Sequence, residues 1–267
     1  MKAKDILYHF LNAGTWVNKE TTVDKIIIGD PEKEIKTVLV TWMSTFESIK
    51  EAARDGISMI ITHEPTFWQH ENEIETMNTE IFDGIAVKKK DFIEKSGIVI
   101  LRCHDFWDGK PENGIPWAWA EFLGLGNKPT AISSDGYILM FDTKPVALED
   151  FAKQIAEKTA NIGEPYVQVC GSPNKLVSKV SVGTGCICDP AEMQKIGCDV
   201  AIVCDDGTSY WHDIQPAKDS DFPVIRVNHG TSEEPGMLSL FEYVKENFPG
   251  LEVSFKPHGS AFRLVGK

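Results

Sequence analysis

Short apolar, β-branched runs alternate with segments of helical periodicity, and this alternation limits the possible folds of the chain more than any other feature. The run IKTVLVTW begins at Ile35, the helical pattern FESIKEAARDG begins at Phe46, and the run ISMIIT begins at Ile57. A strand, a helix and a second strand in that order predict a β-α-β unit, whose two strands are parallel.

The same alternation continues toward the end of the chain. A helical pattern over residues 81–95 stops before Gly97, where a glycine is expected to close a helix, and GIVILRC follows as a buried strand. The first lobe is therefore predicted to be parallel. After the stretch LGLGNKPT we expect a helix over residues 148–159 and strands at YILMF, YVQVC, KVSVG, CDVAIVCDD, PVIRV and LEVSF. We predict two α/β lobes, residues 1–127 and 128–267.

Charge and hydropathy exclude several classes of function. The chain has 27 Lys plus Arg against 40 Asp plus Glu, a net charge of -13, which argues against a nonspecific nucleic-acid binder. No segment approaches the roughly 18 consecutive apolar residues that a membrane span requires. The polar N-terminal segment and the six cysteines, which we interpret as reduced thiols, predict a cytoplasmic protein.

Three of the predicted strands end at a histidine that has carboxylates close by. In open α/β sheets the carboxyl ends of strands converge on the ligand site. Neutral imidazole and carboxylate are ligands that Zn, Fe(II), Mn and Ni accept. The sequence therefore predicts one metal centre built from residues 61–64, 104–108 and 229–233. The residues concerned are His63 with Glu64, His104 with Asp105 and Asp108, and His229 with Glu233 and Glu234.

The spacing within two of these segments adds a constraint. His104 with Asp108 and His229 with Glu233 are both i,i+4 pairs, which share one face if the segment after the strand is helical. The second pair is equally compatible with a turn that leads into a helix from Glu233, with Ser232 as its N-cap. Either geometry directs both side chains toward the strand end.

A single histidine at a strand end is more often a hydrogen-bonded buried residue than a ligand. The recurrence of the pattern at three strand ends favours the metal site. His9, His70 and His258 lack this setting, and we expect them to be surface or structural residues. His212 follows the strand CDVAIVC, so it either lines the pocket or packs against its neighbours.

The order of these segments resembles the YbgI-like family, which is also called the NGG-one-interacting-factor-three-like family of dinuclear metal proteins. The similarity runs nearly end to end. It implies two α/β lobes, each a mixed sheet flanked by helices, with the metal site in the cleft between them, and assembly into homo-oligomers, commonly hexamers. The blocks that carry it are VDKIIIGDP, KTVLVTWMSTFESIKEAARDGISMIITHEPTFW, GIVILRCHDFWD with GIPWAWAEFLGLG, VSVGTGCICDPAEMQKIGCDVAIVCDDGTSYWH and VNHGTSEEPGMLSLFEYVKENFPGLEV.

By position, the resemblance makes His63, Asp108, His229 and Glu233 metal ligands, and His104 a ligand or a close neighbour of one. Glu64 departs from the pattern, because it stands where the family usually has a second histidine. A carboxylate still binds divalent ions, so we expect one or two of Zn, Fe, Mn or Ni.

Two functions follow from such a centre. The first is metal-assisted hydrolysis of an unidentified small molecule, with Glu64 or Glu234 as general base and His104 or His212 donating a proton to the leaving group. Members of the family are often labelled GTP cyclohydrolase I type 2. The alternative is a non-catalytic protein that binds, delivers or senses a metal ion. We expect no nucleic-acid partner and no membrane partner.

Overall fold

A computed structural model describes residues 1–263 and 265 of the protein. The chain forms two compact units. Unit 1 comprises Met1–Lys110 and Met237–His258, and unit 2 comprises Pro111–Gly236 and Gly259–Lys267. Each is a mixed sheet flanked by helices, which confirms the predicted fold class. The division differs from the expected one at residues 127 and 128, and Leu264, Gly266 and Lys267 of the expected second lobe lie outside the described residues.

Unit 1 contains a five-stranded sheet in the order β1-β4-β3-β2-β11. Strands β4, β3, β2 and β11 are parallel, as expected for β-α-β units, but β1 runs antiparallel to β4 at the edge. The prediction of an entirely parallel first lobe was therefore wrong for that strand. The strands are β1 (Lys25–Ile28), β2 (Thr37–Met43), β3 (Met59–Glu64), β4 (Val99–Arg102) and β11 (Glu252–Phe255).

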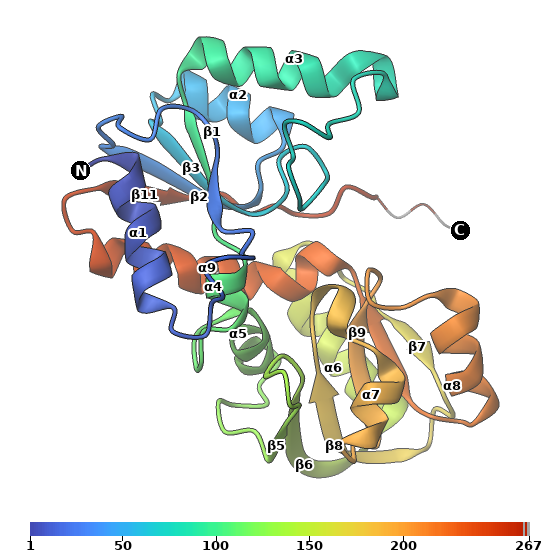
Figure 1. Ribbon diagram of the computed structural model, residues 1–267. Coiled ribbons are helices and arrows are strands. Elements are labelled where there is room, and N and C mark those ends of the chain that lie inside the picture. Colours follow the sequence, from blue (N-terminus) through green and yellow to red (C-terminus); the bar gives the residue numbers. More distant parts are fainter. Residues whose placement is uncertain (264, 266–267) are drawn as a thin grey trace. The chain divides into compact units, whose positions relative to one another are not determined.

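Helices cover both faces of this sheet (Figure 1). Ile49 of α2 (Phe46–Arg54) and Ile93 of α3 (Ile81–Ser96) pack in one buried cluster with Ile60 of β3. Helix α1 (Ala3–Ala13) lies at the other face, where Phe10 stacks on Phe106 with ring centroids 5.2 Å apart. Phe106 belongs to the short helix α4 (Asp105–Asp108), so this aromatic packing fixes the segment that follows β4.

Unit 2 contains a six-stranded sheet in the order β5-β6-β8-β9-β10-β7. Only β8, β9 and β10 are mutually parallel, and the remaining pairs are antiparallel. Its strands are β5 (Ala131–Ile132), β6 (Leu139–Ala147), β7 (Gln168–Cys170), β8 (Leu176–Val182), β9 (Val200–Cys204) and β10 (Val224–Val227). Its helices are α5 (Ile115–Phe122), α6 (Leu148–Thr159), α7 (Pro190–Lys195) and α8 (Gln215–Asp219), the 3-10 helices η1 (Ala160–Ile162) and η2 (Gly185–Ile187), and one π-helical turn, η3 (Tyr210–Ile214).

Two tertiary contacts account for the difference between this division and the expected one. Helix α5 precedes the glycine- and proline-containing stretch, but it packs against β6 and β8, and its Trp119 is buried in the core of unit 2. The closing strand β11 pairs with β2 rather than with the second sheet. Helix α9 (His229–Asn247) carries the chain from unit 2 back to unit 1.

Among residues 1–263 and 265, no helix has both the length and the apolar character needed to cross a membrane.

Candidate metal centre

In unit 1, the ends of two neighbouring parallel strands bring two of the predicted histidines together. Strands β3 and β4 are in register with Thr62 opposite Arg102, so the residues that follow these two positions emerge side by side. The rings of His63 and His104 stack with centroids 4.4 Å apart and planes 7° from parallel. The register of the sheet thus places both imidazoles at its carboxyl edge.

Asp108 joins the two histidines because the chain turns into a helix directly after β4. The carbonyl oxygen of His104 accepts a hydrogen bond from the Asp108 amide, which closes one helical turn. Asp108 Oδ2 then lies 3.1 Å from His104 Nδ1, and Oδ1 lies 3.4 Å from His63 Nε2. The three residues offer ligand atoms that all lie within 4.8 Å of one another. This is the predicted i,i+4 arrangement.

The orientation of His63 is fixed by the backbone. Its side chain is fully buried, and Nδ1 lies 3.1 Å from the carbonyl oxygen of Cys103, which is an acceptor only. Nδ1 therefore carries the proton, and in the neutral ring Nε2 presents a lone pair toward Asp108. A carbonyl behind one ring nitrogen is the usual support for a histidine that binds a metal through the other. The residues present fit a divalent ion.

A buried carboxylate that the sequence did not reveal holds the segment after β4. Asp24 is 3% exposed and accepts the backbone N–H groups of His104 and Phe106, the latter at 2.8 Å. Burial raises the pKa of Asp24, and the two backbone hydrogen bonds act in the opposite direction.

Burial also acts to raise the pKa of Asp105, but hydrogen bonds from His104 and Thr22 outweigh it and lower that pKa to about 2. His104 therefore has two carboxyl groups close to it whose pKa values are shifted in opposite directions.

Glu64 ends β3 and is almost fully buried, 7% exposed. Its Oε2 lies 3.8 Å from Nε2 of His70, and the His70 ring centroid lies 5.0 Å from that of His104. No sequence pattern predicted His70 at this place, because His70 lies in an irregular segment. Arg102 supplies the reason, since its Nη2 donates to the His70 carbonyl oxygen at 2.6 Å.

Unit 2 contains a second pair of predicted ligands. Helix α9 begins at His229, so the helical alternative holds, and His229 Nε2 lies 3.0 Å from Glu233 Oε1. His229 follows β10, which is parallel to β9, and the Asp205 carboxylate after β9 accepts the His229 amide at 2.6 Å. Asp206 Oδ2 lies 3.9 Å from His229 Nδ1. Asp205 and Asp206 were not among the predicted site residues.

A glycine allows the loop after β8 to lie close to His229 and Glu233. Gly185 follows β8 with φ +59°, and a Cβ built there would lie 3.4 Å from Glu233 Oε1 and 3.5 Å from His229 Nε2. Any larger side chain would reach these two predicted ligands. The loop after β8 therefore borders the candidate site, as strand ends in an open α/β sheet are expected to do.

The remaining predicted residues fall in varied settings. Glu234 is 6% exposed beside Glu233, whereas His212 is exposed on the η3 turn, with its amide bonded to Ser209 Oγ at 3.2 Å. Catalytic roles for both stay predictions. His9 lies 2.9 Å from the Tyr243 hydroxyl, and the His258 ring packs edge-on to Trp42. The participation of the unit 1 and unit 2 clusters in one centre also stays a prediction.

The fold and these clusters define a class: an α/β protein of two units with imidazole and carboxylate groups gathered at the carboxyl ends of parallel strands. The chain belongs to the Duf34/NIF3 (NGG1p interacting factor 3) family, which it matches over residues 1–260. This confirms the resemblance drawn from the sequence blocks.

Relatives and solved structures agree with that assignment. A protein from Clostridium perfringens (strain 13 / Type A) called GTP cyclohydrolase 1 type 2 homolog is 25% identical over 262 residues, 92% of each chain. The hypothetical protein SA1388 of Staphylococcus aureus has the same fold, with a TM-score of 0.80 at 21% identity over 99% of both chains. The protein ybgI gives a TM-score of 0.79 at 19% identity and covers 96% of this chain and 98% of its own.

Proposed function

We propose that the protein is a divalent-metal-dependent hydrolase acting on a small molecule. The observation that carries the proposal is the triad of His63, His104 and Asp108, whose ligand atoms lie within 4.8 Å of one another. Imidazole and carboxylate in this proportion suit Zn, Fe, Mn or Ni. His229 and Glu233 are proposed to complete the centre. A bound divalent ion would acidify a water molecule and polarise the bond to be cleaved.

The residues of the chain have separate tasks in this proposal. The carbonyl of Cys103 holds the His63 ring in one tautomer, and Asp24 holds the backbone of His104. Glu64 is the proposed general base, because it is a nearly buried carboxylate directly after a ligand. His212 is a proposed proton donor to the leaving group, and His104 would take that role where the ion is held without it. Glu234 is the other candidate for the general base.

Hydrolysis is further supported by the name of the Clostridium perfringens relative, GTP cyclohydrolase 1 type 2 homolog. The name suggests a ring-opening hydrolysis, and the substrate of this chain is proposed only as a small molecule. Action in the cytoplasm and assembly into a homo-oligomer, a hexamer by family resemblance, stay predictions.

The decisive experiment measures metal and turnover on the same preparations. The protein is purified without chelator, its metals are quantified by mass spectrometry, and phosphoesters, nucleotides and cyclic amides are screened with and without added Mn. We expect near-stoichiometric metal in the wild type, a large loss in Asp108→Ala, and turnover that disappears in Glu233→Ala. Stoichiometric metal without turnover of any substrate would instead identify a metal-binding, metal-delivery or regulatory protein.

A further inference from the structure

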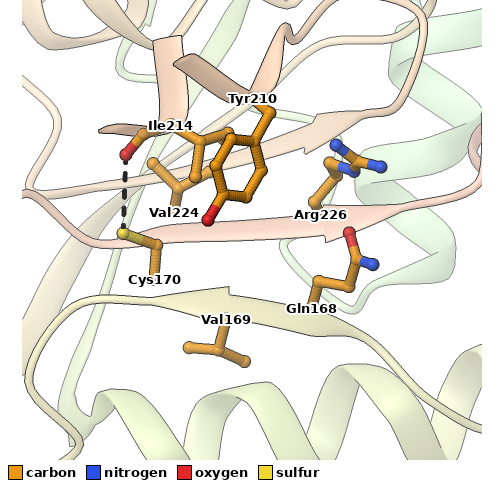
Figure 2. Close-up of a pocket in the computed structure, with 7 residues that line it drawn as sticks. All are labelled: Gln168, Val169, Cys170, Tyr210, Ile214, Val224 and Arg226. Carbon is orange, nitrogen blue, oxygen red and sulfur yellow. Dashed lines mark hydrogen bonds between the residues drawn. The ribbon is translucent and has the colours of Figure 1, made fainter. Parts of the chain in front are cut away.

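Unit 2 contains a cavity that includes none of the candidate metal ligands. Its volume is about 240 Å³, and it lies beside the edge strand β7, the neighbouring strand β10 and the η3 turn. Figure 2 shows the side chains around it: Gln168, Val169, Cys170, Tyr210, Ile214, Val224 and Arg226. The Cys170 thiol lies 3.9 Å from the Ile214 carbonyl oxygen, which joins the turn to the edge strand.

Among the described residues that line the cavity, Arg226 is the only charged one. It lies in β10 between Val203 of β9 and Gln168 of β7, and its side chain is only partly exposed. Within residues 1–263 and 265, its guanidinium makes no ion pair and no side-chain hydrogen bond. A partly buried cation without a counter-charge is costly, so an anionic ligand would recover free energy there.

The nearby carboxylates do not neutralise Arg226. A second cavity of about 160 Å³ shares Arg226 and Gln168 with the first and is also lined by Glu164 and Asp205. The Glu164 carboxylate accepts a hydrogen bond from the backbone N–H of Asn228 at 3.1 Å, and the Asp205 carboxylate accepts one from the backbone N–H of His229 at 2.6 Å. Both carboxylates thus accept hydrogen bonds from the backbone, and no acidic residue lines the first cavity in the described part of the chain.

The rest of the first cavity is apolar and aromatic. Val169, Ile214 and Val224 supply aliphatic surface, and the ring of Tyr210 lies among them in Figure 2. Tyr210 is 74% exposed, so its ring has a large face available to a ligand. In the same view the Gln168 amide and the Arg226 guanidinium lie at one end of the cavity, which separates a polar end from an apolar body.

We propose that this cavity binds a small organic carboxylate with an aromatic or branched apolar body. The planar guanidinium fork of Arg226 matches a carboxylate, and the Gln168 amide adds a neutral donor. One cation and one neutral donor suit a single negative charge. The volume lies below the range of drug-sized sites, which restricts the ligand to a compact molecule.

The test compares benzoate with neutral benzamide in ligand-observed NMR titrations of the full-length protein. We expect benzoate to bind more tightly, Arg226→Gln to weaken benzoate at least tenfold, and benzamide to change little. Arg226→Lys should lose part of the affinity, because it keeps the charge without the fork. Arg54→Gln is the matched control, since Arg54 is an exposed arginine of α2 in unit 1. His63→Ala should bind benzoate normally, because the cavity contains no metal ligand.

Several results would overturn the proposal. They are equal binding of benzoate and benzamide, unchanged benzoate affinity in Arg226→Gln, or no binding of benzoate or 3-methylbutanoate at any soluble concentration. Sedimentation velocity of the wild type and Tyr210→Ala provides a further check. A smaller assembly in Tyr210→Ala would show that the surface joins copies of the chain, which also contradicts a ligand site. Thermal unfolding of each variant confirms that it is folded.

Discussion

The Nδ1 atom of His63 lies 3.1 Å from the carbonyl oxygen of Cys103, and this contact links the ends of two parallel strands into one candidate ligand group. His63 belongs to β3, and Cys103 is the first residue after β4. Because the carbonyl can only accept, the other ring nitrogen is directed toward Asp108. The sheet thus determines which histidine atom is presented for binding.

The first prediction concerns the identity of the ligands. His229→Ala should remove most of the bound metal, because it deletes an imidazole that lies 3.0 Å from Glu233. His258→Ala should leave metal content unchanged, because the His258 ring packs against Trp42. Both variants are measured by mass spectrometry after purification without chelator. Equal loss of metal in both variants, or loss in neither, would contradict a ligand role for His229.

The second prediction concerns the glycine beside His229 and Glu233. Gly185→Val should lower metal affinity roughly tenfold or more, because its side chain would contact two predicted ligands, His229 and Glu233. Gly197→Val is the matched control, since Gly197 also has positive φ, +99°, but has no atom within 4 Å of its would-be Cβ. Each variant should lose about 1–2 kcal/mol of stability from backbone strain. Titrations with Mn that gave equal affinities for the two variants would contradict the role of Gly185.

The third prediction concerns the buried ion pair of Arg102 and Glu73, in which Arg102 also donates to the His70 carbonyl oxygen. Arg102 and Glu73 have side chains 0% and 1% exposed, with Nη1 and Oε1 2.8 Å apart. Burial raises the pKa of Glu73, although Arg102 acts to lower it. Glu73→Gln removes the ion-pair partner of a buried guanidinium and should cost about 3–5 kcal/mol in urea unfolding. Arg54→Gln, which breaks an exposed pair with Asp55, should change stability little. Similar losses in the two variants would refute this account.

The fourth prediction concerns the pH dependence of stability. Burial lowers the pKa of Lys89 to about 8, against the opposing effect of Glu73, and its Nζ donates to the Thr66 carbonyl oxygen at 2.6 Å. Between that pKa and the unfolded value of 10.5, the unfolded chain binds more protons than the folded one. The Lys89 contribution to the free energy of unfolding should therefore rise with pH across this window, by about 3 kcal/mol at most.

Urea unfolding at several pH values tests that window. Lys89→Met should remove the Lys89 share of the rise, and Lys88→Met, at the exposed neighbouring position, should retain it. The difference between the two variants separates Lys89 from other groups that titrate in alkali. A rise of the same size in both variants would show that Lys89 does not contribute to it.

The sequence determined the elements whose pattern is local. The helix over residues 148–159 agrees with α6, and Gly97 closes α3 with φ 69°. The positions of His63 at the end of β3, and of His104 and His229 after β4 and β10, were also predictable, because burial on both faces makes each parallel strand a continuous apolar run. The i,i+4 spacing of His104 and Asp108 needed only one turn of helix.

Only the tertiary structure decided which strands pair and which distant groups meet. The strand LEVSF pairs with β2 and not with the second sheet. The sequence could not predict this partner, because a short strand can form the same backbone hydrogen bonds with any free sheet edge. Asp24 and His70 reach the candidate site through contacts with His104 and Arg102, residues far from them in sequence. The periodicity of the sequence predicts each helix or strand separately. It does not predict these contacts, because they depend on how the elements pack against one another.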